Sequence, residues 1–180
     1  MTGKSLRKVI LYIAESLDGY IATDNDELGF LAVVRIPGED YGYKEFTRTV
    51  DTVIMGRKTY DKVLSFGGDF PHKDKKCFVL SKTRTGKDDH VEFYEGDIAE
   101  LITMLRQTEG KDIYVDGGSG LVFELMKKNL IDRFVISIIP YLLGGGIPLF
   151  KADRPEQELK LTASKVFSSG LVQLTYETIK

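Results

Sequence analysis

Three short segments of this 180-residue chain are rich in glycine, hydroxyl or cationic residues, and each follows a short apolar run. The first comes after residues 52–55 (TVIM) and consists of Gly56, Arg57, Lys58 and Thr59. Glycine lets a ligand approach the backbone, and the following residues open a predicted helix whose free N–H groups attract anions. This segment therefore predicts an anion site, with solvated cations at an ordinary helix start as the alternative.

The second segment comes after residues 77–80 (CFVL) and consists of Ser81, Lys82, Thr83 and Arg84. Two hydroxyls and two cations within four residues suit a phosphate dianion. Taken alone, the segment is more typical of an ordinary polar turn.

The third segment comes after residues 113–115 (IYV) and is rich in glycine. It consists of Asp116, Gly117, Gly118, Ser119 and Gly120, and it leads into a predicted helix. The glycine spacing is not that of a dinucleotide fingerprint, and no Lys stands where a P-loop needs one. Each segment is a weak signal by itself, whereas three such turns after three successive strands predict an anion-binding edge.

The chain between these segments alternates predicted strands with predicted helices. Apolar, β-branched runs typical of strands covered on both faces occur at 8–14, 52–55, 77–80, 113–115 and 134–139. Helices are predicted at 40–50, 57–64, 97–108 and 118–128, the third with Asp97 as its N-cap. This alternation predicts a three-layer α/β/α fold with a mostly parallel sheet, in which ligands bind beyond the carboxyl ends of the strands.

The C-terminal residues have a different pattern. Residues 159–167 and 171–178 are joined by Ser-Ser-Gly and predict an antiparallel hairpin at the edge of the sheet. The length of the chain is that of one domain, covering 1–180.

Charge, hydropathy and cysteine count argue against several classes of protein. The net charge is −2 without a basic run, so no nucleic-acid partner is expected. A single Cys and two His argue against a metal site. No apolar run reaches the roughly 20 residues of a membrane span, and the N-terminal residues lack a signal-peptide cleavage site. We therefore expect a cytoplasmic protein without a metal or a membrane partner.

Five longer motifs follow one another along the chain. They are SLDGYIA (16–22), VDTVIMGRKTY (50–60), FVLSKT (78–83), IYVDGGSGLVFELM (113–126) and IPYLLGGGIPLF (139–150). With them the chain resembles the dihydrofolate reductase superfamily nearly end to end, and most closely the branch that includes the reductase domain of bacterial riboflavin biosynthesis. The resemblance implies a dihydrofolate reductase-like fold and an NADPH-dependent oxidoreductase. Its small-molecule substrate would be a heterocycle, either pterin- or dihydrofolate-like or ribosylaminopyrimidine-like.

The resemblance also implies cofactor-binding roles. Ala14 and Ile21 would meet the nicotinamide through backbone groups, while the phosphates would be held by Gly56, Arg57, Lys58 and Thr59. The adenosine 2′-phosphate, which would favour NADPH over NADH, would be bound by Ser81, Lys82, Thr83 and Arg84. The pyrophosphate and ribose would lie against Gly117, Gly118, Ser119, Gly120 and Leu121.

For the proton, the resemblance implies a carboxylate at the first helix. Counting back from MGRKTY without gaps reaches Asp40, although Asp at a helix start is also a common N-cap. The rival carboxylates are Glu39, Glu45 and Asp18, of which Asp18 is first of all typical of a turn with Gly19. The chain has no Trp, and its segment 24–37 departs from the mobile loop of the folate enzyme, which counts against dihydrofolate itself.

Two functions stay open at this point. One is the reductase, and the other is a non-catalytic nucleotide-binding, dimerising module, because a fold does not dictate a function. The riboflavin branch dimerises through its sheet, so the resemblance implies a homodimer in either case.

Overall fold

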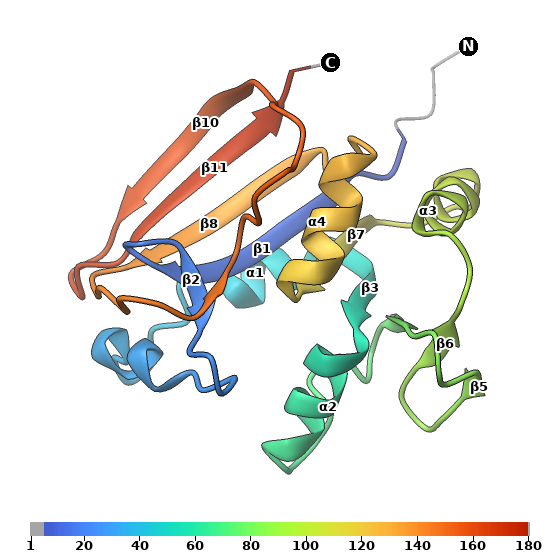
Figure 1. The fold of residues 1–180 in the computed structure, drawn as a ribbon, viewed down its shortest axis with the longest axis horizontal. Coiled ribbons are helices and arrows are strands. Elements are labelled where there is room, and N and C mark those ends of the chain that lie inside the picture. The colour runs from blue at the N-terminus through green and yellow to red at the C-terminus, as the bar shows by residue number, and fades with distance from the viewer. Residues whose placement is uncertain (1–5, 180) are drawn as a thin grey trace.

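Within residues 6–179, which the computed structural model describes, nine strands form one sheet (Figure 1). Their order across the sheet is β10-β11-β8-β1-β7-β3-β4-β6-β5. Their bounds are β1 (Val9–Ser16), β3 (Val50–Gly56), β4 (Lys76–Leu80), β5 (Gly86–Lys87), β6 (Glu92–Tyr94), β7 (Asp112–Gly117), β8 (Arg133–Ile139), β10 (Leu159–Val166) and β11 (Val172–Thr178). The strands from β8 to β6 run parallel, and β10, β11 and β5 are antiparallel to their neighbours. The predicted mostly parallel sheet with an antiparallel C-terminal hairpin is confirmed.

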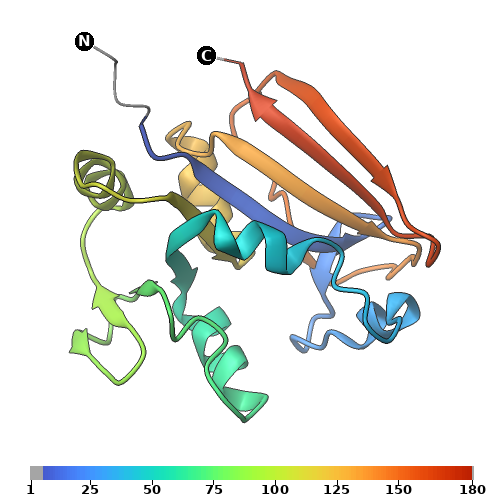
Figure 2. The same cartoon turned by 180° about the vertical axis from the view of Figure 1, so that it is seen from behind.

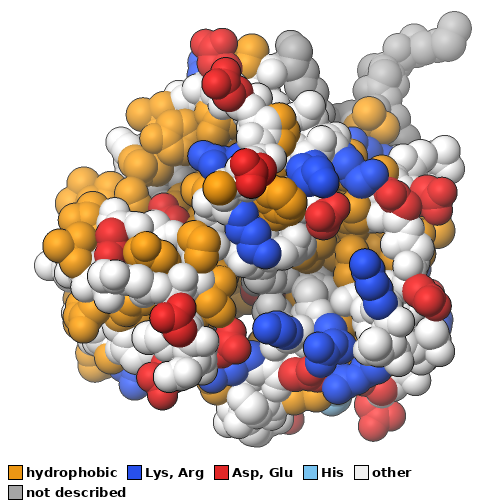
Figure 3. All heavy atoms as spheres, in the orientation of Figure 1, with side chains coloured by type: hydrophobic (Ala, Val, Ile, Leu, Met, Phe, Trp, Pro, Cys, Tyr) orange, Lys and Arg blue, Asp and Glu red, His pale blue; other side chains and the backbone are white. Residues whose placement is uncertain are grey.

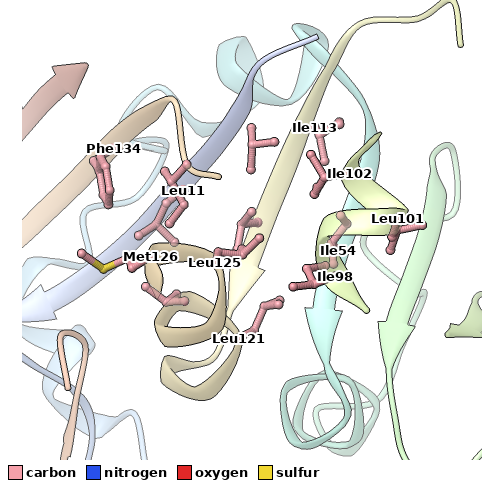
Figure 4. Close-up of a cluster of buried hydrophobic side chains, with 14 of the residues drawn as sticks. Leu11, Ile54, Ile98, Leu101, Ile102, Ile113, Leu121, Leu125, Met126 and Phe134 are labelled. Carbon is pink, nitrogen blue, oxygen red and sulfur yellow. The ribbon is translucent and has the colours of Figure 1, made fainter. Parts of the chain in front are cut away.

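Helices cover both faces of this sheet (Figures 1 and 2). α1 (Tyr43–Arg48) and α2 (Arg57–Ser65) pack on one face, and α3 (Ile98–Gln107) and α4 (Ser119–Lys127) pack on the other. Because side chains alternate along a strand, Ile54 of β3 joins the α3–α4 cluster shown in Figure 4, whereas Val53 and Met55 lie under α1 and α2. No helix in the described range is long and apolar enough to span a membrane.

α2, α3 and α4 match their predicted bounds closely. Asp97 caps α3 as predicted, since its carboxylate accepts a hydrogen bond of 2.7 Å from the N–H of Ala99. α1 is shorter than the predicted 40–50. Tyr41 and Gly42 have φ values of +56° and +83°, and this left-handed backbone keeps the chain out of the helix before its first turn.

A two-stranded arm follows the carboxyl ends of β1 and β8. It pairs β2 (Tyr20–Ala22) with β9 (Ile147–Pro148), and a 3-10 helix η1 (Gly29–Val34) follows β2. The Asp18 carboxylate fastens the arm by accepting hydrogen bonds from the N–H groups of Leu143 and Gly144, at 3.0 and 2.7 Å. The sequence patterns predicted neither this arm nor η1.

The sheet opens between β1 and β7 near their carboxyl ends. The last pair of their ladder is Leu11 with Val115, whereas β1 continues beside β8 to Ser16 and β7 continues beside β3 to Gly117. From β3 the chain passes through α2 to β4, on one side of the strand order. From β7 it passes through α4 to β8, on the other side of that order. Open α/β sheets bind ligands where the connections diverge in this way. We refer to this opening as the β1–β7 gap.

Candidate functional site

The first and third glycine-containing segments meet at the ends of the neighbouring strands β3 and β7. A Cβ built on Gly56 would lie 3.8 Å from the carbonyl oxygen of Gly117 and 3.9 Å from the nitrogen of Gly118. A Cβ on Gly118 would lie 3.3 Å from Oγ1 of Thr59, and the peptide bond between Gly117 and Gly118 is cis. The two turns therefore lie in van der Waals contact, and the absence of a side chain on Gly118 leaves room for the start of α2 at Thr59.

The second segment is joined to the first through Asp61, on α2. The two oxygens of the Asp61 carboxylate accept hydrogen bonds from Nη1 of Arg57 at 2.9 Å and from Nη1 of Arg84 at 2.7 Å. Sequence reasoning missed Asp61, although its i,i+4 spacing from Arg57 was a visible signal. The structure thus brings all three segments together along the ends of β7, β3 and β4.

The starts of α2 and α4 lie at this edge without a side-chain cap. Their N-caps are Gly56 and Gly118, and neither first turn carries an acidic residue. Free N–H groups at a helix start carry a partial positive charge that favours phosphate. Figure 3 shows the molecule hollowed between α4 and α2, with Lys and Arg side chains around the hollow. The arrangement fits the phosphates of a dinucleotide.

Ser81 shapes the second segment. It is buried, and its Oγ accepts hydrogen bonds from the backbone N–H groups of Thr83 at 3.2 Å and Arg84 at 2.9 Å. Its hydroxyl hydrogen can still be donated to a ligand. Lys82 and Thr83 are exposed beside it. The role of this segment at an adenosine 2′-phosphate stays a prediction.

A cavity of about 320 Å³ lies on the other side of the β1–β7 gap, against β1 and β8. Ala14 and Ser137 line it from the sheet, and its polar side chains also include Tyr12, Arg35, Glu39, Asp40, Tyr41 and Tyr43. A cavity of this size holds a small ring compound. The side chain of Ile21, the second residue expected at the nicotinamide, packs against the α3–α4 cluster, and the expected contact through its backbone stays a prediction.

Asp40 lies at the rim of this cavity, just before α1. Its carboxylate accepts hydrogen bonds of 3.1 Å from the N–H groups of Lys44 and Gly42, and these bonds hold its pKa below the usual range. The N-cap of α1 is Gly42, so Asp40 lies two residues before it, and its bonds to backbone N–H groups keep the side chain ionised. Asp40 is therefore suited to accepting hydrogen bonds from a substrate rather than to donating a proton.

The rival carboxylates have other partners. Asp18 accepts a hydrogen bond from Oγ of Ser16 at 2.6 Å, and this bond together with those that fasten the arm lowers its pKa to about 2. Glu39 lines the cavity and accepts a hydrogen bond of 2.7 Å from the N–H of Tyr41. Glu45 is exposed in the first turn of α1. Asp18 thus serves the arm rather than the cavity.

Glu15 is a carboxylic acid that sequence reasoning passed over. It follows Ala14 on β1, its Oε2 is buried without a hydrogen-bond partner, and burial raises its pKa to about 7. By alternation its side chain lies on the same face of β1 as Ile13, which is the α4 side of the sheet. A carboxylate inside an apolar strand pattern was the signal that could have identified it.

Glu15 is only partly buried, so solvent screening reduces the energetic effect of its raised pKa. With this reduction we expect Glu15→Gln to stabilise the protein at pH 8 by about 2 kcal/mol, and to change little at pH 4. The pKa of Glu15 is raised in the folded state to about 7, so the fold favours the protonated form. As the pH rises from the unfolded pKa through the folded one, the wild-type protein must bury a charge and loses stability, which the amide avoids. Urea unfolding at several pH values measures the difference.

The matched control is Glu124→Gln, which removes an exposed carboxylate from α4. Its unfolding free energy should follow that of the wild-type protein at every pH. Parallel stability curves for Glu15→Gln and the wild type would contradict the assignment of a buried acid.

Asp116 is a second residue to which sequence reasoning gave no role. It ends the apolar part of β7 directly before Gly117, and its side chain is 18% exposed beside the gap. Its Oδ1 accepts a hydrogen bond of 2.5 Å from the hydroxyl of Tyr114, and its Oδ2 lies 3.2 Å from Nε2 of His72. Within residues 6–179, no group of three or more His, Cys, Asp or Glu side chains is placed to hold a metal ion.

Comparison with known proteins relates this arrangement to one family. The sequence model of the family described as the RibD C-terminal domain matches residues 7–173. The chain is 42% identical over 171 residues to "Uncharacterized protein YwjB" of Bacillus subtilis (strain 168), which covers 94% of this chain and 97% of that protein.

Two solved structures share the fold. A "Putative riboflavin biosynthesis protein" from Shewanella sp. PV-4 superposes with a TM-score of 0.89 at 37% identity, covering 96% of this chain and 99% of that one. A dihydrofolate reductase from Enterococcus faecalis, complexed with NADP(H), superposes with a TM-score of 0.67 at 17% identity, covering 96% and 97%. At that identity the second likeness shows the fold alone.

Proposed function

The chain belongs to the RibD C-terminal domain family, and from this premise we propose that it is an NADPH-dependent reductase that passes a hydride to a small heterocyclic substrate. One observation carries the proposal. The glycine turns and uncapped helix starts lie at the ends of β7, β3 and β4, and the 320 Å³ cavity lies against β1 and β8, with the β1–β7 gap between them. In the proposed arrangement the cofactor phosphates bind at the ends of β7, β3 and β4, and the substrate binds in the cavity. The proposal includes a cytoplasmic location.

When bound, NADPH supplies the hydride, and the protein supplies binding and orientation. The cavity wall is suited to orientation because its polar groups bind one another. The Tyr12 hydroxyl donates to the carbonyl of Tyr41 at 2.9 Å, and the Gln173 amide donates to the oxygens of Tyr12 and Ser137 at 3.0 and 3.1 Å. A wall held in this way loses little freedom when a ligand binds. Its hydroxyls and carboxylates match the N–H and carbonyl groups of a pterin or an aminopyrimidine.

Isothermal titration with NADPH and NADH tests the cofactor directly, and loss of NADPH absorbance with a panel of pterins and ribosylaminopyrimidines tests turnover. We expect NADPH to bind more tightly than NADH and at least one class of substrate to be reduced. Binding of neither nucleotide below millimolar concentration would contradict the proposal. Binding without turnover of any compound would favour the non-catalytic nucleotide-binding module.

Asp40→Asn is expected to lower turnover about tenfold while leaving the Kd of NADPH unchanged. The amide retains the shape of the side chain but removes the negative charge that would orient a substrate in the cavity. Asp69→Asn is the control, because Asp69 is exposed and pairs with Lys73 away from the cavity. An Asp40→Asn variant with wild-type turnover of the same substrate would exclude a catalytic role for Asp40.

We also propose a homodimer through the part of the sheet formed by β8, β11 and β10. β10 is an edge strand, and its Leu161 and Val166 side chains are 51% and 76% exposed. Figure 3 shows hydrophobic side chains gathered over this part of the molecule. Light scattering should give twice the mass of one chain, and Val166→Lys should shift it toward the monomer. A monomeric wild-type protein at micromolar concentration would overturn the proposal.

A further inference from the structure

Two arginines from different segments of the chain share one carboxylate beside the proposed cofactor site. Arg57 begins α2, whereas Arg84 lies in the turn that follows β4. Gly56 of β3 pairs with Leu80 of β4, so the helix and the turn start at the same edge of the sheet. The two oxygens of Asp61 accept hydrogen bonds from Nη1 of Arg57 at 2.9 Å and from Nη1 of Arg84 at 2.7 Å. The carboxylate therefore bridges two segments that the backbone only places side by side.

This bridge acts on the position of the arginines more than on the stability of the fold. The side chains of Arg57, Arg84 and Asp61 are 41%, 45% and 36% exposed, and ion pairs at such positions contribute little to the free energy of unfolding. Two guanidinium groups repel each other, however, and an anion between them allows both to stay close. Asp61 supplies this anion in the free protein.

Both arginines keep donors that are free for a ligand. A guanidinium has several N–H groups, and within residues 6–179 each of these two gives only its Nη1 to a hydrogen bond, the one to Asp61. The ring of Phe93 on β6 supports Arg84 from another side, with its centroid 5.9 Å from Cζ. A phosphate monoester has three oxygens and a double negative charge, so it can accept hydrogen bonds from both guanidinium groups at once.

We propose that Asp61 is a positioning residue that holds Arg57 and Arg84 in one orientation, so that both bind the adenosine 2′-phosphate of NADPH. This inference rests on the proposed function and supplies a cause for its preference for NADPH. Long cationic side chains lose rotamer freedom when they bind a ligand, and a bridge formed before binding reduces that loss. The carboxylate also repels the phosphate, but solvent and salt screen charges at such exposed positions, so the gain exceeds the repulsion.

The test compares NADPH with NADH in two variants of Asp61. We expect Asp61→Asn to weaken NADPH about tenfold and NADH by less than about twofold, and Asp61→Glu, which retains the carboxylate, to weaken NADPH by less than about threefold. Titration calorimetry measures all of these affinities. Equal weakening of both nucleotides by Asp61→Asn would indicate a merely structural role, and tighter binding of NADPH would show that the carboxylate only repels the phosphate. Either result would overturn the proposal.

Two further variants separate the bridge from a change of net charge. Asp69→Asn is the matched control, because Asp69 forms the same kind of i,i+4 ion pair with Lys73, and both nucleotides should bind to it within about twofold of the wild type. In Arg84→Ala the bridge is already lost, so adding Asp61→Asn should weaken NADPH no further. A second tenfold loss in this double variant would show that Asp61 acts independently of Arg84 and would contradict the inference.

A measurement on the free protein tests the bridge without a nucleotide. In NMR of arginine-labelled protein, the guanidinium groups of Arg57 and Arg84 should rotate slowly in the wild type and faster in Asp61→Asn. Equal mobility in the two proteins would overturn the inference. Adenosine 2′,5′-bisphosphate, which lacks the nicotinamide, separates this inference from the proposed function. Binding of this probe without binding of NADPH would refute the reductase and retain the phosphate assignment, whereas a wild-type protein that does not bind the probe would refute the phosphate assignment.

Discussion

Replacing Arg57 with Ala is expected to weaken NADPH binding about 10- to 100-fold without unfolding the protein. Arg57 is the first residue of α2, and its side chain is 41% exposed at a helix start that has no side-chain cap. A guanidinium that pairs with phosphate contributes about 1.5–3 kcal/mol, which corresponds to this range. Only its Nη1 is hydrogen-bonded to Asp61, so its other N–H groups can reach a phosphate. Titration calorimetry measures the change.

Two variants serve as controls for Arg57→Ala. Lys62→Ala removes a cation from the last turn of the same helix and should leave the Kd of NADPH within about twofold of the wild type. Arg84→Ala removes the second partner of Asp61 and should weaken NADPH more than NADH if this segment meets the 2′-phosphate. Wild-type affinity for NADPH in Arg57→Ala would exclude the first segment as a phosphate site.

Gly117→Ala is expected to abolish NADPH binding and to lower the free energy of unfolding by about 2–3 kcal/mol. Gly117 has a φ of +102°, a backbone conformation that residues other than glycine rarely adopt. The added Cβ would also lie 3.3 Å from Cδ1 of Ile13, on the neighbouring strand across the gap. It would enter the space in which the proposed cofactor approaches the backbone. Thermal unfolding and NADPH titration of the same sample measure the two effects.

Gly144→Ala separates backbone strain from crowding. Gly144 also has a positive φ, of +77°, but nothing lies within 4 Å of its Cβ position. This control should lose only about 1 kcal/mol of stability from its backbone conformation and should bind NADPH normally. If Gly117→Ala bound NADPH as Gly144→Ala does, the ends of β3 and β7 would not be the cofactor site.

Most of the fold could be predicted because its signals are local. The apolar run at 8–14 and the i, i+4 pattern with an Asp cap at 97–108 express strand and helix geometry within a few residues. The arm of β2 and β9 could not be predicted in this way. Its strands are two or three residues long, and it is held by Asp18 through bonds to residues 125 and 126 positions further along the chain.

The candidate site likewise has features with a local signal in the sequence and features without one. Each of the three segments has a residue composition that suits an anion, and that composition is visible in the sequence. Asp61 had a local signal because it is one helical turn from Arg57, but its second partner, Arg84, is 23 residues away. The contact of His72 with Asp116 spans 44 residues and has no periodic pattern behind it.

The sequence by itself determined the elements, the segments that follow the strands, and the family resemblance, since these depend on the order of residue types along the chain. Only the tertiary structure decided which segments meet, that the sheet opens beyond Leu11 and Val115, and that a cavity lies against β1 and β8. The tertiary structure also decided the protonation state of these carboxylates. A pKa depends on burial and on partners brought in from other strands, so Asp40 and Asp18 stay ionised while the pKa of Glu15 rises to about 7.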